Sequence, residues 1–287
     1  MEYWLISTEH LEDSLLFKDF DDFVVGMNYV AVQAYKARIN MLAFILMSNH
    51  VHFVAEGDRI QVETFINGFK GEYSRYLWNK YSIRELLRRK SVDIRPIPKD
   101  NESLERAIAY VQMNCVAANI CAHPVEYPWG TGNTFFSASC ENGKCLRDLS
   151  ARERIRLLHT KLELPQYWSV CSDGYVTPGS YVCKDFVERI FRTPKRMNFF
   201  LQNSSKAKQR VETGEKNMPA FRDQVIAAAL PDLCRTLFQK PAVGELNEDQ
   251  LVELLRQLRF RFSSNVNQLA RITGLSYEKA AEYLDRE

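Results

Sequence analysis

The sequence predicts an α+β fold, in which helices pack on an antiparallel sheet and an all-α region ending in a helix-turn-helix follows. The first observation is the order of the segments, because β-rich and helical stretches succeed one another as βαββα, then an extended segment, then a helix. The second is a hairpin-like pair, Arg38–Met47 and Val51–Ala55, separated only by a short polar turn. The third is the mostly helical character of the chain after residue 149. This combination suits an antiparallel sheet covered by helices.

Each element of the first half follows from a local pattern. β-rich runs predict strands, and apolar residues at helical spacing predict helices. Two prolines in Ser91–Pro98 restrict that segment to a sheet edge or a loop. Ser103 is a suitable N-cap for the helix that follows it. The expected elements are a strand at Tyr3–Ser7, a helix at Asp21–Tyr35, strands at Arg38–Met47 and Val51–Ala55, and helices at Glu63–Tyr81 and Leu104–Ala118.

Changes in composition divide the chain into three expected domains. Residues 124–143 are rich in Gly, Pro, Ser, Asn and Thr and close the first domain, which we place at residues 1–140. Residues 141–244 are expected to be a mainly helical connecting region to which the sequence assigns no role. Residues 245–287 are expected to be a separate helical unit.

Composition is that of an ordinary globular protein, but the charge is unevenly distributed. The 287 residues are 46% hydrophobic and 26% charged, with a net charge of +2, which excludes a disordered chain. Residues 1–68 carry 4 Lys or Arg against 10 Asp or Glu, whereas residues 69–99 carry 9 against 3 and residues 184–216 carry 9 against 4. Two basic segments within a near-neutral total favour a polyanionic partner.

Nothing in the sequence indicates export or membrane insertion. The longest purely apolar run, Met41–Met47, is far shorter than the roughly 20 residues that span a bilayer. The N-terminus has no basic stretch followed by an apolar core. Seven cysteines, an odd number in a chain without a signal, indicate reduced thiols. We therefore expect a cytoplasmic protein without a membrane partner.

Two histidines and one helix carry the candidate chemistry. His50 and His52 are two apart on a strand, so their side chains point to one face and could bind Mn²⁺, Mg²⁺ or Zn²⁺ together with oxygen ligands. Arg106, Tyr110 and Asn114 are spaced by four on a helix and share a face. They could act as phosphate clamp, nucleophile and metal ligand. From spacing alone, hydrogen-bonded histidines and a half-buried tyrosine are the commoner outcome.

Four stretches, in order along residues 1–137, resemble the HUH single-tyrosine transposases. Within that group the chain is most similar to the REP-associated tyrosine transposases, relatives of the small insertion-sequence transposases that act on single-stranded DNA. The chain departs from the family at Cys115, where proline is usual, and in the charged stretch Arg84–Lys90. The four stretches are the His-hydrophobic-His segment Asn49–Val54, the helix Gly68–Asn79, the segment Tyr110–Asn114 and the closing segment His123–Trp129.

The resemblance implies a ferredoxin-like (RRM-like) HUH domain and a metal-dependent transposase that cuts and rejoins hairpin-bearing single-stranded DNA. By position, His50, His52 and Asn114 would bind a divalent cation, Mg²⁺ or Mn²⁺. Tyr110 would be the nucleophile and would form a 5′-phosphotyrosine intermediate. The free 3′-hydroxyl can then attack the adduct, so no external energy source is needed. Related transposases are commonly dimeric, which makes a homodimer one expectation.

Basic side chains after the histidines are expected to contact the DNA backbone, in binding that weakens steeply with salt. Tyr73, Tyr76, Trp78 and Tyr81 interleave with them, and unpaired bases can stack on such rings. Tyr73 and Tyr76 are nevertheless expected to be core residues of an amphipathic helix. The expected DNA contacts here are Lys70, Arg75, Lys80, Arg84, Arg88, Arg89 and Lys90, with Arg106 on the tyrosine helix.

The C-terminal unit has the pattern of a helix-turn-helix. Ala270 suits a close helix contact, Gly274 the turn and Ser276 the cap of the second helix. Tyr277 and Lys279 would then contact duplex DNA. Because acidic residues outnumber basic ones on this second helix, docking of a protein partner is an alternative.

Three other functions stay open at this point. They are a non-catalytic DNA-binding regulator that keeps the fold, a replication-type nickase of the wider HUH class, and a metal hydrolase without covalent chemistry. Adduct formation separates the enzyme from the regulator, and rejoining separates the transposase from the nickase. A hydrolase would still cut DNA after Tyr110→Phe.

Overall fold

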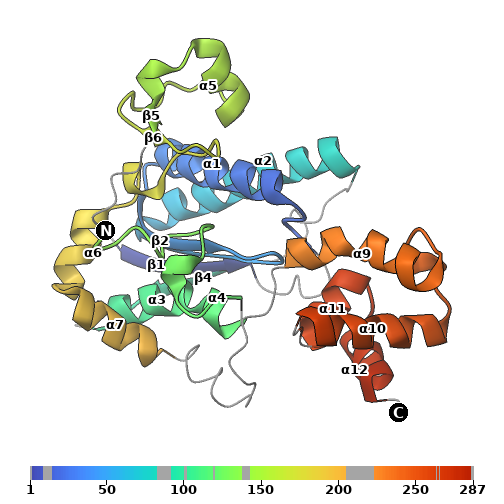
Figure 1. Cartoon of the computed structure of the whole chain (residues 1–287). Coiled ribbons are helices and arrows are strands. Elements are labelled where there is room, and N and C mark those ends of the chain that lie inside the picture. The colour runs from blue at the N-terminus through green and yellow to red at the C-terminus, as the bar shows by residue number, and fades with distance from the viewer. Residues whose placement is uncertain are drawn as a thin grey trace.

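A central antiparallel sheet with helices on both faces, and a second group of helices at one end of it, make up the computed structural model of the chain (Figure 1). The structure describes residues 2–8, 15–82, 92–99, 102–118, 120–137, 143–204, 223–262, 264 and 266–285. The predicted α+β class is confirmed. Among these residues no helix is both long and apolar enough to cross a membrane.

The sheet has four strands in the order β2-β3-β1-β4, and all of its neighbours pair antiparallel. β2 and β3 form the predicted hairpin, and β4 lies at the edge, where the lost donor of Pro96 is tolerated. The strands are β1 (Glu2–Thr8), β2 (Asn40–Leu46), β3 (Val51–Gly57) and β4 (Val92–Ile97).

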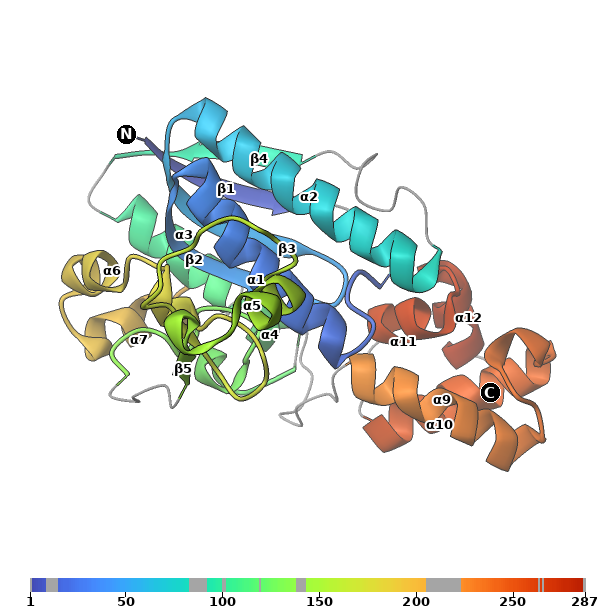
Figure 2. The ribbon, with the colours of Figure 1, turned by 90° about the horizontal axis from the view of Figure 1, so that it is seen from above.

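Two long helices cover one face of the sheet and a short one covers the other (Figures 1 and 2). α1 (Phe20–Ala37) and α2 (Arg59–Tyr81) run side by side over the first face. Each begins with a capping box, from Asp19 and Asp58 respectively, so side chains satisfy the first backbone N–H groups. α3 (Ser103–Gln112) lies on the opposite face.

The helix predicted at Leu104–Ala118 is in fact two helices. α3 ends at Gln112, and α4 (Asn114–Ala117) begins after Met113. The predicted N-cap is also wrong, because Ser103 is already helical and Glu102 occupies the cap without a side-chain hydrogen bond. Consequently the sequence positions 110 and 114 lie on either side of a helix break.

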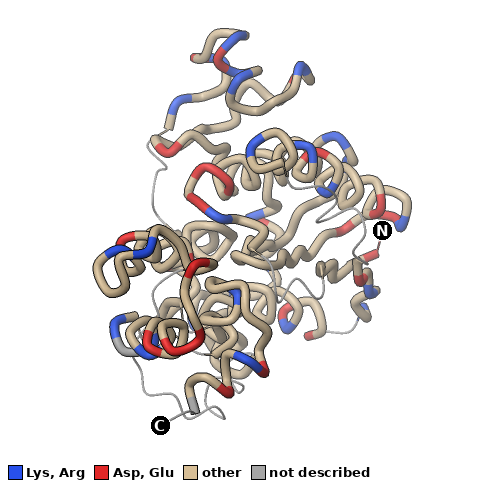
Figure 3. Tube along the Cα trace, turned by 90° about the vertical axis from the view of Figure 1, so that its right-hand side faces the viewer, with Lys and Arg blue, Asp and Glu red and all other residues tan. Residues whose placement is uncertain are grey.

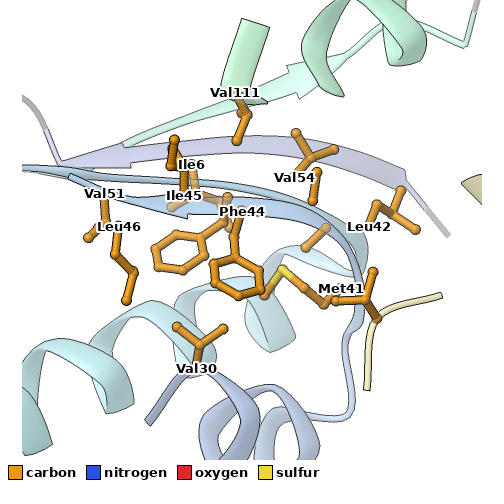
Figure 4. Packing of buried hydrophobic residues seen from close by; sticks show 14 of the residues in the cluster. Ile6, Val30, Met41, Leu42, Phe44, Ile45, Leu46, Val51, Val54 and Val111 are labelled. Carbon is orange, nitrogen blue, oxygen red and sulfur yellow. The ribbon is translucent and has the colours of Figure 1, made fainter. Parts of the chain in front are cut away.

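The side chains that meet between the layers form a continuous core (Figure 4). Val111 of α3 lies against one face of the sheet and Val30 of α1 against the other. On the α2 side, the ring of Phe53 has its centroid 5.0 Å from that of Phe65. This packing fixes which face of β3 each side chain occupies.

The free edge of β2 is covered by the segment around Trp129. Leu46 N donates to Trp129 O at 2.8 Å, and Thr131 N donates to Phe44 O at 3.0 Å. Gly130 lies so close to β2 that a Cβ there would be 2.7 Å from Phe44 O. The predicted closing segment of the first domain therefore extends the sheet instead of leaving an open edge.

Residues 143–204 add a small two-stranded sheet and three helices around the first core. Their apolar residues from Tyr175 to Leu201 pack into that core. A separate small cluster joins Ala31 and Val32 of α1 to this region. The elements are β5 (Lys144–Cys145), α5 (Ala151–Leu158), β6 (Ser169–Val170), α6 (Lys184–Phe191) and α7 (Pro194–Gln202), with 3-10 turns at Leu146–Asp148 and Pro178–Ser180. One further 3-10 turn, Pro124–Glu126, precedes this region.

Four C-terminal helices share a second hydrophobic cluster, which we call the C-terminal unit. It includes Ile226, so α9 packs with the helices that follow residue 245, and the predicted boundary between the second and third domains falls inside this cluster. The domain boundaries at 140 and 244 stay predictions. The helices are α9 (Asp223–Phe238), α10 (Glu248–Phe262), α11 (Val266–Thr273) and α12 (Tyr277–Asp285), with a 3-10 turn at Val243–Glu245.

Candidate active site

The sheet places His52 at the centre of the candidate site. It pairs with Ser7 of β1 on one side and with Ile45 of β2 on the other. Neighbouring residues on a strand point to opposite faces, and Phe53 is directed at α2. The imidazole of His52 is therefore directed at the face that α3 covers.

Tyr110 of α3 meets the histidine pair on that face. Its ring centroid is 5.6 Å from that of His52, and the ring centroid of His52 is 4.9 Å from that of His50; both pairs are edge-to-face, with interplanar angles of 81°. His52 is 7% exposed, while His50 and Tyr110 are partly exposed. The structure thus brings together the three residues that the sequence proposed from two segments about 60 positions apart.

The polar turn before β3 orients His50. Its Nδ1 lies 2.8 Å from Asn49 Oδ1. An amide oxygen only accepts hydrogen bonds, so this contact requires the hydrogen on Nδ1 and leaves the lone pair of the ring on Nε2. A neighbouring acceptor of this kind is what orients metal-ligating histidines. Asn49 belongs to the His-hydrophobic-His segment, but the sequence alone indicates no role for it.

Asn114 lies at the start of α4 and is 3% exposed. Its Nδ2 donates to Tyr110 O at 2.8 Å and to Val111 O at 3.2 Å, which ties the side chain across the break at Met113. Only the amide oxygen is then suited to a cation. The side chain of Asn114 is thus held next to Tyr110, with its amide NH₂ group directed at the helix carbonyls.

The residues present fit a divalent cation in their chemistry. Two imidazoles next to one another, one with its tautomer set, together with an amide oxygen, are compatible with Mn²⁺, Mg²⁺ or Zn²⁺. Within the described ranges, no three His, Cys, Asp or Glu side chains converge as a metal site.

The residues predicted to bind DNA near the site lie in different surroundings. Lys70 is partly buried, which lowers the pKa of its ammonium group. Arg75 pairs with Glu72 at 2.6 Å, and Arg106 pairs with Glu102 at 2.5 Å, both as exposed ion pairs on helix surfaces. Arg84, Arg88, Arg89 and Lys90 lie outside the described residues.

The aromatic residues of α2 are mostly structural, as predicted for two of them. Tyr73 is fully buried and donates to Leu16 O at 3.0 Å. Tyr76 and Tyr81 donate to Asp22, at 2.8 Å and 3.0 Å, so they are unsuited to stacking on bases. Trp78, with an exposed fraction of 40%, is the better stacking surface among these rings.

Tyr277 and Lys279 lie on the surface of the C-terminal unit. Gly274 has a φ of +74°, and Ser276 Oγ accepts from Lys279 N at 3.2 Å, as the predicted turn and cap require. Lys279 Nζ lies 5.6 Å from the ring centroid of Tyr283. Figure 3 shows both basic (blue) and acidic (red) positions along the described helices.

One family model matches the part of the chain that carries His50 and His52. Residues 13–92 match the family model described as "Transposase IS200 like". We call these residues, which are similar to that family, the IS200-like region. The resemblance predicted from the motifs is thereby confirmed for these residues, which include His50 and His52. Tyr110 and Asn114 lie beyond the matched IS200-like region.

The comparisons with solved structures and with curated proteins add one further similarity. The chain is similar to the structure of the REP-associated tyrosine transposase bound to a REP hairpin, with a TM-score of 0.35 and 12% sequence identity over 46% of this chain and 78% of that one. No curated protein matches the chain.

One contact of the IS200-like region was not foreseen. Ser48, in the turn before His50, donates to Asp223 of α9 at 2.5 Å. The two residues are 175 positions apart, and the sequence contains no local signal that would pair them.

Proposed function

We propose that the protein is a metal-dependent DNA strand transferase that cuts and rejoins hairpin-bearing single-stranded DNA, with Tyr110 as its nucleophile. The observation that carries the proposal is the contact of the Tyr110 ring with His52 of β3, whose ring in turn contacts that of His50 just before the strand. The IS200-like match covers the histidines, and the fold adds a tyrosine from a segment outside that match.

The residues have distinct parts in this proposal. The phenol oxygen of Tyr110 attacks the scissile phosphorus, forming a 5′-phosphotyrosine bond while the P–O3′ bond breaks and a 3′-hydroxyl leaves. A phenol with an ordinary pKa near 10 is mostly protonated at neutral pH and needs assistance. His50, His52 and the amide oxygen of Asn114 would hold a divalent cation, which when bound polarises the phosphate and offsets its developing charge. Asn49 fixes the ring of His50.

The reverse step needs no additional group. A 3′-hydroxyl attacks the phosphotyrosine, the phosphodiester re-forms and the phenol of Tyr110 leaves. If the hydroxyl belongs to another strand, the result is strand transfer. If it belongs to the original strand, the cut is resealed. The basic residues Lys70, Arg75 and Arg106, with Arg84, Arg88, Arg89 and Lys90, would contact the DNA backbone.

The test is adduct formation on single-stranded DNA. Wild type, Tyr110→Phe and Tyr167→Phe are incubated with hairpin-bearing oligonucleotides and Mg²⁺ or Mn²⁺, then resolved on a denaturing gel. Tyr167 is 70% exposed and remote from the proposed chemistry, so it controls for loss of a phenol. We expect a metal-dependent covalent band in wild type and Tyr167→Phe and none in Tyr110→Phe, with DNA binding retained. An adduct of equal yield in Tyr110→Phe contradicts the assignment.

A second candidate is a DNA-binding regulator that keeps the transposase fold without catalysis. It is favoured by the side chain of Asn114, whose Nδ2 is bonded to Tyr110 O and Val111 O, and by Arg106, which is paired with Glu102. Salt-sensitive DNA binding without an adduct in any of the three proteins would support this function.

For the C-terminal unit we propose a helix-turn-helix that binds duplex DNA through Tyr277 and Lys279. The support is the turn at Gly274 and the cap at Ser276. Loss of sequence preference after Tyr277→Ala and Lys279→Ala, without loss of folding, is the expected result. Unchanged preference would instead favour docking of a protein. A homodimer and a cytoplasmic location complete the proposal, and sedimentation and cell fractionation test them.

A further inference from the structure

The C-terminal unit is anchored to the turn that carries His50. Asp223, the first residue of α9, is 2% exposed, and its carboxylate accepts from Ser48 Oγ at 2.5 Å. The same carboxylate accepts from Gln268 Nε2 at 2.8 Å and lies 3.1 Å from Arg271, whose side chain is 15% exposed. One buried carboxylate therefore joins two helices of the C-terminal unit to the IS200-like region.

The turn itself has little freedom at the point of contact. Ser48 is 4% exposed, and its carbonyl accepts from Leu16 N at 2.6 Å and Phe17 N at 3.0 Å. Met47 N donates to His50 O at 2.8 Å, which closes the turn. The backbone of Ser48 is held on one side and its hydroxyl on the other. These contacts fix the direction in which the chain runs from the turn to His50.

A buried ion pair is an unfavourable way to join helices if docking is its only role. Burying a carboxylate and a guanidinium removes both from water, and apolar side chains of similar size would often dock the unit at least as well. What the ionised carboxylate adds is direction, since it can accept from Ser48, Gln268 and Arg271 at defined angles. The junction also occupies Arg271, which removes that cation from any surface available to DNA.

We propose that Asp223 is a positioning residue of the candidate active site, so that the C-terminal unit sets the orientation of His50 through Ser48. The proposal rests on the proposed function for its catalytic consequence, but its structural content concerns the imidazoles alone. Asp223 touches neither DNA nor the reacting atoms. It acts through the hydroxyl of Ser48 and the turn that ends at His50.

The test uses the full chain in three variants. Ser48→Ala removes the hydrogen bond from Ser48 Oγ to Asp223 and retains the Asp223–Arg271 pair, so we expect the C-terminal unit to stay folded. Asp223→Asn keeps an acceptor for Ser48 but removes the charge that faces Arg271. Ser74→Ala is the matched control, because Ser74 is a buried serine on α2 that is 8% exposed and lies outside the site.

The primary measurement is the imidazole ¹⁵N and ¹H chemical shifts of His50 and His52 in the metal-free protein at constant pH. We expect the His50 signals to move in Ser48→Ala and in Asp223→Asn and to stay at wild-type positions in Ser74→Ala. Circular dichroism establishes that each variant is folded; if Asp223→Asn fails to fold, Ser48→Ala alone decides. Wild-type His50 shifts in folded Ser48→Ala overturn the proposal.

Kinetics supply the second measurement and separate the two proposals. Where wild type forms the adduct, Ser48→Ala should lower kcat by about 10- to 100-fold with little change in KM, as expected for a misplaced group in a reacting site. An unchanged kcat overturns the positioning role. If wild type forms no adduct, the proposed function fails, and the imidazole shifts still decide whether Asp223 positions His50.

Discussion

Removing the carboxylate of Asp22 should destabilise the protein more than removing any exposed charge. Asp22 lies in the first turn of α1 with a fully buried side chain. The carboxylate accepts from Lys18 N at 2.7 Å and Asp19 N at 3.3 Å. It also accepts from the hydroxyls of Tyr76 and Tyr81 and from Lys80 Nζ, the last at 2.8 Å. Five donors thus depend on one side chain.

The magnitude follows from the partners that Asp22→Ala leaves behind. Loss of one partner from a buried ion pair costs about 3–5 kcal/mol, because the other charge remains desolvated. Lys80 is 28% exposed and keeps its contact with Asp19 at 2.6 Å, which places the loss near the lower end, at about 3 kcal/mol. The matched control is Glu63→Ala, which removes an exposed ion pair with Arg59 and should cost less than about 0.5 kcal/mol.

Urea unfolding followed by tryptophan fluorescence measures both variants. The ring of Trp129 stacks on Phe23 at 4.8 Å between centroids, so this tryptophan reports on the start of α1. With a denaturant slope of about 1–3 kcal/mol/M, a loss of about 3 kcal/mol lowers the midpoint by about 1 M or more. A loss below about 1 kcal/mol in Asp22→Ala, or one equal to that of Glu63→Ala, would refute the argument.

Three further predictions concern the same layers of the molecule. Burial opposes ionisation of Asp19, but hydrogen bonds from Lys80, from the backbone of Asp22 and from Tyr81 lower its pKa overall. Ionised Asp19 therefore stabilises the fold fully above its unfolded pKa of about 4, and this stabilisation is lost as the pH falls through the folded pKa. When the pH is lowered below about 4, the urea midpoint should decrease, and it should decrease less steeply in Lys80→Met. Gly130→Ala should displace the segment around Trp129 from β2 and lower the free energy of unfolding in urea by about 2 kcal/mol, because two hydrogen bonds are lost. Gly71→Ala is the control: a Cβ at this position on α2 has no neighbour within 4 Å, so the substitution should raise the free energy of unfolding by about 0.5–1 kcal/mol. Equal urea midpoints for the two variants would contradict this. Asn49→Ala should weaken Mn²⁺ binding by about 10-fold or more in electron paramagnetic resonance titrations, while Asn40→Ala, at an exposed pair on β2, should not; equal affinities would remove the orienting role of Asn49.

Local patterns were sufficient to predict the layers of the sheet domain. Alternation and helical spacing predicted β1, the β2–β3 hairpin, α1 and α2 to within a few residues, because each buries one face against the sheet. The break at Met113 could not be predicted in this way, since Tyr110, Val111 and Asn114 continue the helical pattern in sequence. The hydrogen bonds of the Asn114 amide to two helix carbonyls became visible only in three dimensions.

The candidate site shows the same division between local and distant information. Spacing placed His50 and His52 on one strand face, and family resemblance supplied Tyr110, but neither gave the support around them. Asp223 looks like an ordinary acidic residue at the start of a helix. Its burial depends on Arg271 and on Ser48, partners far apart in the sequence. A buried charge of this kind can be recognised only when the desolvated partners are seen together.

The supports of the histidine turn form one connected structure. Tyr73 of α2 donates to Leu16 O, the backbone of Leu16 donates to Ser48 O, and the hydroxyl of Ser48 donates to Asp223. The turn before His50 is therefore held between α2 and the C-terminal unit. Tyr110 lies on α3, on the other face of the sheet from α2, and meets the histidines through its ring contact with His52. Substitutions along the turn should therefore act on His50 directly and reach Tyr110 by way of the histidine rings, whereas substitutions on α3 should act on Tyr110 directly.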